Sequence, residues 1–455
     1  MGALIYDFKK LERLIKPSWI YNIYHFKPVE KFCIDSRLIR RRKEAFVAIK
    51  GRHHDGHKFI QEAVDRGAAL IIAQEYVPTK PKVPFFVVDD TYQALSQLVS
   101  YIRKKKKIFI YGITGSIGKT TTKEMLSFLL EPYYKVLKNK ETENNILGLA
   151  KTIFSLEDEK IAVLELGTNQ KGEIESLAKA CIPDVGIITS IKPVHLQGLK
   201  SLAGIRDEKL SLFSVNLKMK AILNRDDSYL AKLKIKNKTF WFGKQKDNGL
   251  CGRLIKREDG ESVFLIQEKY ELRLPVHLEH FISNALAAIS GASLLNLAVH
   301  GLVERMNEFK NFSSMRMQML PVCGYTVLND AYNANPYSFS KALEALKNHP
   351  LKKVAVVADM LELGKKTQHY HEKLASQLSE AGFDYCLTFG DFSRYINDRL
   401  KELGYKNAFH FSSHKKIADF INKRIGSNIQ QKKRYLIFLK GSRKMELENI
   451  IKHLR

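Results

Sequence analysis

The chain has 455 residues, of which 45% are hydrophobic and 27% charged, and its net charge is +27. This length exceeds what one hydrophobic core supports, so we expect about three domains. No apolar run approaches the ~18 residues of a transmembrane helix. The N-terminal stretch MGALIYDFKKLERL also lacks the long apolar segment of a signal peptide, so we expect a cytoplasmic protein without membrane insertion.

The cysteines and the basic residues set further limits. The five cysteines are scattered without a C-x-x-C pair, which argues against a zinc site and a disulfide framework. Basic runs at 40–43 and 103–107 are compatible with a nucleic-acid partner. No aromatic residues alternate with basic ones as in a single-strand platform, however. We favour a generally basic surface and keep a nucleic-acid-stimulated ATPase as an alternative.

The first hundred residues differ in pattern from the rest of the chain and contain short apolar segments, namely EAFVAIKG, AALIIAQ and PFFVVDD. They predict a small mixed α/β domain over residues 1–102. From about residue 105, apolar runs without alternation are separated by amphipathic helical stretches; these runs are KIFIYGIT (107–114), KIAVLELGT (160–168), DVGIITSI (184–191) and MKAILN (219–224). Such runs are typical of buried parallel strands. We therefore predict a central, doubly wound parallel-sheet α/β domain over residues 103–310.

A second series of apolar runs follows later in the chain: KKVAVVADM (352–360), YCLTFGD (385–391) and RYLIFLKGS (434–442). Helical patterns lie between or before them. We predict a Rossmann-like α/β domain over residues 311–455.

The segment TGSIGKT, after the first strand of the central domain, has the composition of a phosphate loop. Its glycines allow backbone N–H groups to face phosphate oxygens, and the following helix start adds partial positive charge. Lys119 is placed to reach the β- and γ-phosphates, and the Thr120 hydroxyl to ligate Mg²⁺. The strict motif requires glycine at 113, where this chain has Ile113. The predicted ATP-binding residues are Thr114, Gly115, Ser116, Ile117, Gly118, Lys119 and Thr120.

Two more polar residues follow predicted strands. Glu165 ends one strand where a metal-binding acid of an ATPase would lie, although alone it could equally be a surface carboxylate. His195, just after the strand VGIITSI, would by itself more often be structural. Both gain weight because the carboxyl ends of parallel strands share one edge with the phosphate loop.

With these motifs in place the chain resembles the Mur ligases, the ATP-dependent peptide ligases of bacterial cell-wall synthesis. The form TGxxGKTT, with a displaced glycine, is that family's form. The resemblance spans all three predicted domains through NNILG (144–148), LELGTNQKGEI (164–174), PDVGIITSI (183–191), VHLQGLKSLAGI (194–205), HFISNALAA (280–288), ADMLELG (358–364) and LKGSR (439–443).

The stretch LNDAYNANPYSF (328–339) resembles the DDAYNANP signature of the branch that joins D-alanyl-D-alanine to a UDP-N-acetylmuramoyl-tripeptide. IDSR, FVAIKG and DGHKFI resemble the domain that holds the UDP-sugar in this branch. The chain departs from the family at Ser190, Glu279, Asn329 and Ala358. Two alternatives stay open: a sister ligase that adds a single amino acid, and a folylpolyglutamate-type ligase. The NDAYNANP segment speaks against both.

The resemblance implies that ATP converts a carboxylate into an acyl phosphate, which the dipeptide amine then attacks. It implies catalytic roles for Lys119, Lys209, His195 and Arg316. It implies that His280, Asn284, Arg316 and Asp330 contact the nucleotide. The implied Mg²⁺ ligands are Thr120, Glu165, His195 and Lys209, the last as a carbamylated lysine, although from its pattern alone Lys209 is an exposed helical residue. The implied substrate contacts are Ser36, Arg37, Lys50, Asp55, Gly56, His57, Asn144, Asn145, Asn333 and Asn335. We expect a monomer whose domains close before chemistry.

Overall fold

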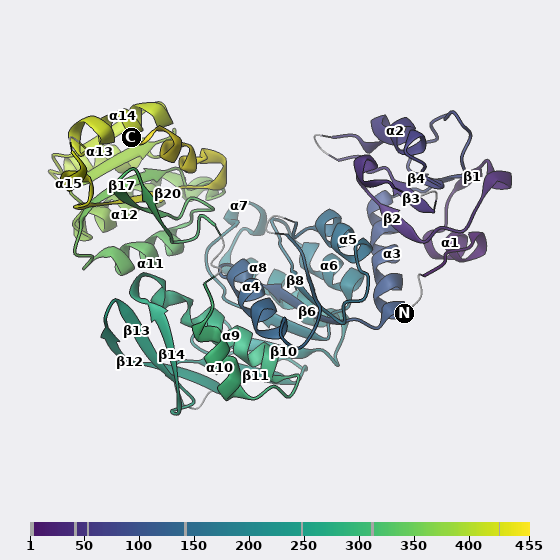
Figure 1. Ribbon diagram of the computed structural model, residues 1–455, viewed down its shortest axis with the longest axis horizontal. Coiled ribbons are helices and arrows are strands. Elements are labelled where there is room, and N and C mark those ends of the chain that lie inside the picture. The colour runs from purple at the N-terminus through teal and green to yellow at the C-terminus, as the bar shows by residue number, and fades with distance from the viewer. Residues whose placement is uncertain are drawn as a thin grey trace.

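The computed structural model describes residues 4–40, 43–51, 54–140, 143–246, 249–310, 314–426 and 428–455. These residues form three sheets of five, nine and six strands, in chain order. Figure 1 shows three bodies, with the central one between the N-terminal and C-terminal ones. The predicted three-domain α/β architecture is confirmed.

The first sheet has the strand order β1-β5-β4-β3-β2. Only the edge pair β1 and β5 is antiparallel. Successive side chains of its strands point to opposite faces of the sheet, and both faces are apolar. One face packs on helices α1 and α3, and the other packs on α2. The bounds are α1 Phe8–Ile15, β1 Trp19–Tyr21, β2 Lys31–Cys33, β3 Glu44–Val47, α2 Ile60–Asp65, β4 Leu70–Ala73, β5 Phe85–Val87 and α3 Thr91–Lys106.

Helix α3 joins the first two bodies. It begins at Asp90, whose carboxylate accepts hydrogen bonds from the Tyr92 and Gln93 N–H groups, and it packs on α1 as well as on α5 and α6 of the central body. The basic run at 103–107 forms its last turn and the residue after it, where positive charge interacts favourably with the helix dipole. The proposed boundary between residues 102 and 103 falls inside this helix, so the domain limits stay predictions.

The central sheet has the order β14-β13-β12-β11-β10-β9-β6-β8-β7. Strands β6 to β11 pair in parallel as predicted. An antiparallel ribbon, β12 to β14, extends this sheet, which the sequence analysis did not anticipate. The strand bounds are β6 Phe109–Thr114, β7 Val136–Lys138, β8 Ile161–Glu165, β9 Val185–Ile188, β10 Lys220–Asn224, β11 Thr239–Gly243, β12 Leu250–Glu258, β13 Glu261–Ile266 and β14 Tyr270–Pro275.

Helices cover both faces of the central sheet, which is why its strands are apolar without alternation. On one face lie α4 Lys119–Leu130, α9 Ile282–Ser293 and α10 Val299–Asn307; on the other lie α3, α5 Ile146–Phe154 and α6 Glu173–Cys181. Helices α7 Leu196–Leu199 and α8 Leu202–Leu210 follow β9. The chain runs from β6 outward to β7 and β8 and then crosses to β9 on the other side, so β6 ends at a topological switch point, where α/β sheets bind ligands.

The C-terminal sheet has the order β15-β16-β20-β17-β18-β19, and β15 is its one antiparallel strand. Helices α11, α12 and α13 cover one face and α14 the other. The bounds are β15 Gln318–Val322, β16 Tyr325–Asn329, α11 Pro336–Leu346, β17 Lys352–Ala358, α12 Thr367–Glu380, β18 Tyr385–Phe389, α13 Arg394–Glu402, β19 Ala408–Phe411, α14 His414–Arg424, α15 Ile429–Lys432 and β20 Tyr435–Lys440.

Helix α11 also packs on the central body, where it contacts the short helix η5 (Val276–Phe281). Figure 1 shows α11 close to the β12–β14 ribbon. Within the described ranges, no helix is long and apolar enough to cross a bilayer.

Candidate functional site

The phosphate loop lies between β6 and α4, and its glycines have steric reasons. Gly115 and Gly118 have φ values of 148° and 84°, which favour glycine. A Cβ on Gly115 would overlap the Thr189 side chain, and one on Gly118 would overlap the amide of Asn284. Ile113 lies inside β6 in the apolar core. The position where the strict motif has glycine is therefore part of the strand here.

Two side chains from outside the loop donate hydrogen bonds to carbonyl groups of the loop. Thr189 Oγ1 donates to the Ile117 carbonyl at 2.5 Å, and Asn284 Nδ2 donates to the Gly118 carbonyl at 3.1 Å. Because the C=O and N–H of a trans peptide point in opposite directions, the N–H groups of Gly118 and Lys119 face away from these partners. This is the orientation that an anion-binding loop requires. Sequence reasoning missed Thr189, which only the fold brings to the loop.

Lys119 folds back onto the loop, and its Nζ donates to the Gly115 carbonyl at 3.0 Å. Burial lowers the pKa of Lys119; Glu165 opposes this shift and Arg316 adds to it. A phosphate group at this position would supply a negative charge beside the partly buried Lys119 and Arg316.

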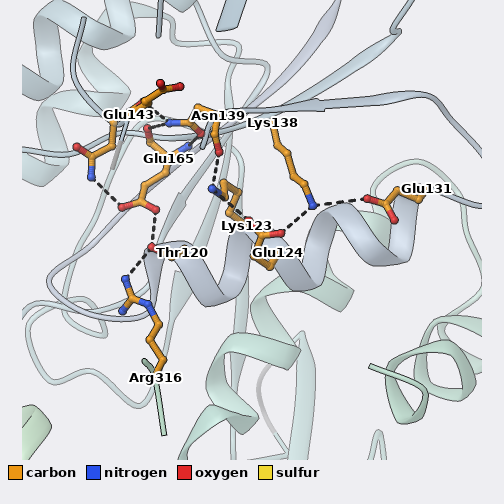
Figure 2. Close-up of polar contacts among 10 residues, drawn as sticks. Thr120, Lys123, Glu124, Glu131, Lys138, Asn139, Glu143, Glu165 and Arg316 are labelled. Atoms are coloured by element: carbon orange, nitrogen blue, oxygen red, sulfur yellow. Dashed lines mark hydrogen bonds and ion pairs between the residues drawn. The ribbon is translucent and has the colours of Figure 1, made fainter. Parts of the chain in front are cut away.

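Thr120 is the meeting point of three parts of the chain, as Figure 2 shows. Its hydroxyl donates to Glu165 Oε2 at 2.6 Å and accepts from Arg316 Nη2 at 3.0 Å. The other carboxylate oxygen of Glu165 accepts from Asn144 Nδ2 at 3.0 Å. Arg316 also stacks on the Tyr332 ring, with 3.8 Å between the guanidinium carbon and the ring centroid. The structure thus brings a C-terminal arginine to the phosphate loop.

This donor set fits a magnesium–nucleotide rather than a closed metal cage. Over the described part of the chain, no three His, Cys, Asp or Glu side chains gather as a metal site. Thr120 and Glu165 offer hydroxyl and carboxylate oxygens, and both residues are buried. Mg²⁺ in nucleotide sites takes one or two such protein ligands and completes its shell with water and phosphate oxygens.

His195 contacts the C-terminal domain. Its Nδ1 lies 2.5 Å from Glu362 Oε2 in the C-terminal domain, and both residues have positive φ values. The hydrogen bond from His195 lowers the pKa of Glu362 against the effect of burial. Glu362 lies in the ADMLELG motif, but the sequence offered no sign that it pairs with His195.

The expectation that Lys209 is exposed is wrong: its side chain is buried, with 1% of the residue exposed. The buried residues of α8 are Ile205, Glu208 and Lys209. Because two of these three are charged, a pattern of apolar residues could not reveal the burial of Lys209. Glu208 accepts hydrogen bonds from the Gly172 and Ile174 N–H groups. Burial lowers the pKa of Lys209 far below its ordinary value, Lys119 acts the same way, and Glu208 opposes both.

His280 and Asn284 lie on either side of a helix junction, His280 in η5 and Asn284 in α9. Asn284 Nδ2 also donates to Thr122 Oγ1 at 3.0 Å, which ties α9 to α4. Burial, with the charges of Lys440 and Lys341, lowers the pKa of His280 to about 3. Its Nδ1 is buried without a hydrogen bond to any described residue.

The NDAYNANP segment follows β16. Asp330 accepts from the Met317 N–H at 3.1 Å and contacts Lys440 Nζ, which also donates to the Asn333 carbonyl at 3.2 Å. Asn335 caps α11: its Oδ1 accepts from the Ser338 N–H, and its own N–H donates to Ser338 Oγ. The structure therefore gives Asn335 a local role, and Asn145 likewise caps α5.

The predicted UDP-sugar residues of the N-terminal domain have local partners. The Ser36 hydroxyl donates to Glu62 at 2.9 Å, and the Arg37 guanidinium pairs with Asp35 through two hydrogen bonds. Further contacts link His57 Nδ1 to Asp55 at 2.7 Å and Lys50 to Glu75 at 3.4 Å. Gly56 packs so closely that a Cβ would lie 2.6 Å from the Ile49 nitrogen.

Comparisons with known proteins give a consistent result. Residues 113–292 match the Mur ligase middle domain, and residues 315–443 match the Mur ligase, glutamate ligase domain. The chain is 30% identical to the UDP-N-acetylmuramoyl-tripeptide–D-alanyl-D-alanine ligase of Bacillus subtilis (strain 168), over 98% of this chain and 97% of that protein. It is 31% identical to the ligase of the same name from Haemophilus influenzae, over 94% of each chain.

Solved structures agree with these relatives. A crystal structure of MurF from Acinetobacter baumannii matches with a TM-score of 0.87 and 25% identity, and the match covers 100% of this chain and 99% of that one. MurF ligase from Thermotoga maritima in complex with ADP matches with a TM-score of 0.81 and 26% identity over 93% of this chain and 96% of that one.

Proposed function

This chain belongs to the Mur ligase family, and from that membership we propose that it joins D-alanyl-D-alanine to a UDP-N-acetylmuramoyl-tripeptide with cleavage of ATP. This step belongs to peptidoglycan precursor synthesis, and the relatives carry the name of the ligase that joins these two substrates. The observation that carries the proposal is the contact of Arg316, from the C-terminal domain, with Thr120 of the phosphate loop. This contact supports a nucleotide site between the two domains.

The chemistry starts from a carboxylate, which is a poor electrophile at neutral pH. An oxygen of the tripeptide carboxylate attacks the γ-phosphorus of ATP, the bond to the bridging oxygen breaks, and ADP leaves. The dipeptide amine then attacks the acyl carbon and loses a proton, and phosphate leaves as the amide forms. The enzyme contributes chiefly positioning and charge neutralisation.

The residues of the phosphate loop would neutralise the phosphoryl group. Lys119 precedes Thr120 in the chain, Arg316 contacts its hydroxyl, and the loop N–H groups add donors. Thr120 and Glu165 would hold Mg²⁺, which shields charge on the nucleotide when bound. We assign His280, Asn284 and Asp330 to the nucleotide side, and the unpartnered Nδ1 of His280 supports this for that residue.

Lys209 and His195 would serve the acyl phosphate. A carbamate forms from a neutral amine and CO₂, and the burial that lowers the pKa of Lys209 favours the neutral amine. The product is a carboxylate that could accompany His195 at a second cation. Asn333 and Asn335 would lie near the acceptor dipeptide, Asn144 and Asn145 near the tripeptide, and Ser36, Arg37, Lys50, Asp55, Gly56 and His57 near the UDP group. We also infer a cytoplasmic monomer.

The decisive experiment measures phosphate release from Mg-ATP with a UDP-N-acetylmuramoyl-tripeptide, with and without D-alanyl-D-alanine. We expect release to require both substrates and the product mass to increase by the dipeptide. Release that responds to a single amino acid would identify a sister ligase. Release stimulated by DNA would favour the nucleic-acid-dependent ATPase instead.

A further inference from the structure

Lys123 is a buried lysine beneath the phosphate loop that the mechanism above does not use. It lies one turn after Thr120 on α4, and none of its side chain is exposed. Its Nζ donates to the Asn139 carbonyl at 2.5 Å and lies 3.2 Å from Glu124 Oε1. Figure 2 shows this contact on the side of Glu165 that faces away from Arg316. Burying an ammonium group is costly, so a lysine here requires a reason that a residue such as methionine would not satisfy.

Asn139, whose carbonyl accepts from Lys123, hydrogen-bonds through its side chain to the main chain of Glu165. Its Oδ1 accepts from the Glu165 N–H at 2.8 Å, and its Nδ2 donates to the Glu165 carbonyl at 3.0 Å. Asn139 directly follows β7, which pairs in parallel with β8, the strand that ends at Glu165. The asparagine side chain thus continues the pairing of the two strands beyond the end of β7.

A second connection joins the same two elements. Glu124 Oε2 lies 2.7 Å from Nζ of Lys138, the last residue of β7. Although burial raises the pKa of Glu124, the hydrogen bond from Lys138 and the charge of Lys123 outweigh it and hold this pKa below its ordinary value. The ion pair therefore persists at neutral pH. Helix α4, which carries Thr120, is joined to the end of β7 at two consecutive residues.

We propose that Lys123 is a positioning residue that sets the place of the Glu165 carboxylate relative to the Thr120 hydroxyl through Asn139. Without this link, α4 and the end of β8 would be related through the Thr120–Glu165 contact itself, the Glu124–Lys138 pair and apolar packing. Apolar packing tolerates small shifts more easily than directed hydrogen bonds. Groups behind a metal ligand that fix its orientation commonly contribute a factor of ~10–100 in metal affinity. The inference rests on the proposed function, because it concerns how this chain would bind Mg²⁺ together with a nucleotide.

The chain offers a matched control in Lys353. This lysine is also buried, with 6% of the residue exposed, and its Nζ donates to the Leu346, Lys347 and Ala381 carbonyl groups at the ends of α11 and α12. It has the same chemistry as Lys123 but belongs to the C-terminal domain. Replacing it tests the loss of a buried lysine without changing the surroundings of Glu165.

The experiment measures ADP binding to the full chain by titration calorimetry, once with Mg²⁺ and once with EDTA, and compares the two dissociation constants. For the Lys123→Met variant we expect an unchanged constant in EDTA and a Mg²⁺-dependent gain in affinity that is smaller by ~10-fold or more. The Lys353→Met variant should lose thermal stability but keep the Mg²⁺-dependent gain of the unsubstituted protein. The readout is binding, so it does not depend on turnover.

A Lys123→Met protein that folds and keeps the full Mg²⁺-dependent gain would overturn the positioning role alone. If that variant does not fold, Asn139→Ser interrupts the same link while leaving Lys123 in place, and an undiminished gain would have the same meaning. If the unsubstituted chain shows no Mg²⁺-dependent gain, the proposed nucleotide chemistry itself fails. The two failures are thus distinguished.

Discussion

At the scale of single residues, the candidate site is defined by cations that are buried or partly buried. Lys209, Lys119 and Arg316 all lie close to the phosphate loop, and the first two have lowered pKa values. Such groups are stabilised when an anion arrives, which favours binding of polyphosphates over neutral ligands. The site is therefore electrostatically incomplete without its substrates.

Lys209 gives a prediction at this scale. Because carbamate formation consumes the neutral amine, enzyme depleted of CO₂ should lose most of its ligase activity and regain it on addition of bicarbonate. Lowering the pH should weaken the recovery, since the amine is protonated as the pH falls through its lowered pKa. Phosphate release measures the recovery, and carbon-13 NMR with labelled bicarbonate detects the carbamate. Lys353→Met should respond as the unsubstituted chain does, and a rate independent of bicarbonate without a carbamate signal would contradict the assignment.

At the scale of elements, two helices begin at glycines with nearly the same backbone conformation. Gly118 precedes α4 with a φ of 84°, and Gly172 precedes α6 with a φ of 92°. A Cβ on Gly172 would meet nothing within 4 Å, whereas one on Gly118 would overlap Asn284. Substituting alanine at Gly172 therefore tests backbone strain alone. The same substitution at Gly118 also tests the close approach of Asn284 to the loop.

We expect Gly172→Ala to lower the free energy of unfolding by about 1–2 kcal/mol, the strain of a left-handed residue, and to leave ADP binding unchanged. Gly118→Ala should cost more and weaken ADP binding at least ~10-fold, because Asn284 must release the Gly118 carbonyl. Urea denaturation and calorimetry measure the two quantities. Equal ADP affinity in both variants would show that the loop tolerates a displaced Asn284.

At the scale of the whole molecule, the C-terminal domain contacts the central one at several charged groups. His195 pairs with Glu362, and Lys192 Nζ lies 5.1 Å from the centroid of the Tyr337 ring. These contacts lie beside the phosphate loop, since Ser116 Oγ exchanges hydrogen bonds with the backbone of Lys192. We therefore predict that domain closure and site assembly occur together.

Removing the Glu362 carboxylate should shift the domains toward separation. A half-exposed pair of this kind contributes about 1 kcal/mol, so Glu362→Gln should favour the open form by roughly fivefold. Small-angle scattering without ligands should then give a larger radius of gyration, while Glu380→Gln, at an exposed position on α12, should not. Nucleotide and UDP-tripeptide should restore compaction in both. If Glu362→Gln scatters like the unsubstituted chain, the His195 contact does not hold the domains together.

The strands and the phosphate loop could be predicted from the sequence, because they depend on residues that are close together in the chain. Apolar runs predicted β6, β8 and β9, because strands buried on both faces need no polar positions. Glycine spacing before Lys119 predicted the phosphate loop, because backbone conformation depends on neighbouring residues. Residue patterns also led to the family, which the comparisons confirmed.

Only the tertiary structure decided which distant side chains meet. Arg316 reaches Thr120 across 196 residues, and the pairing of His195 with Glu362 spans 167. The burial of Lys209 and the link from Lys123 to Glu165 likewise follow from how helices pack on the central sheet. Periodicity reports which face of an element is apolar, whereas a buried polar group is placed by partners that the local sequence does not contain.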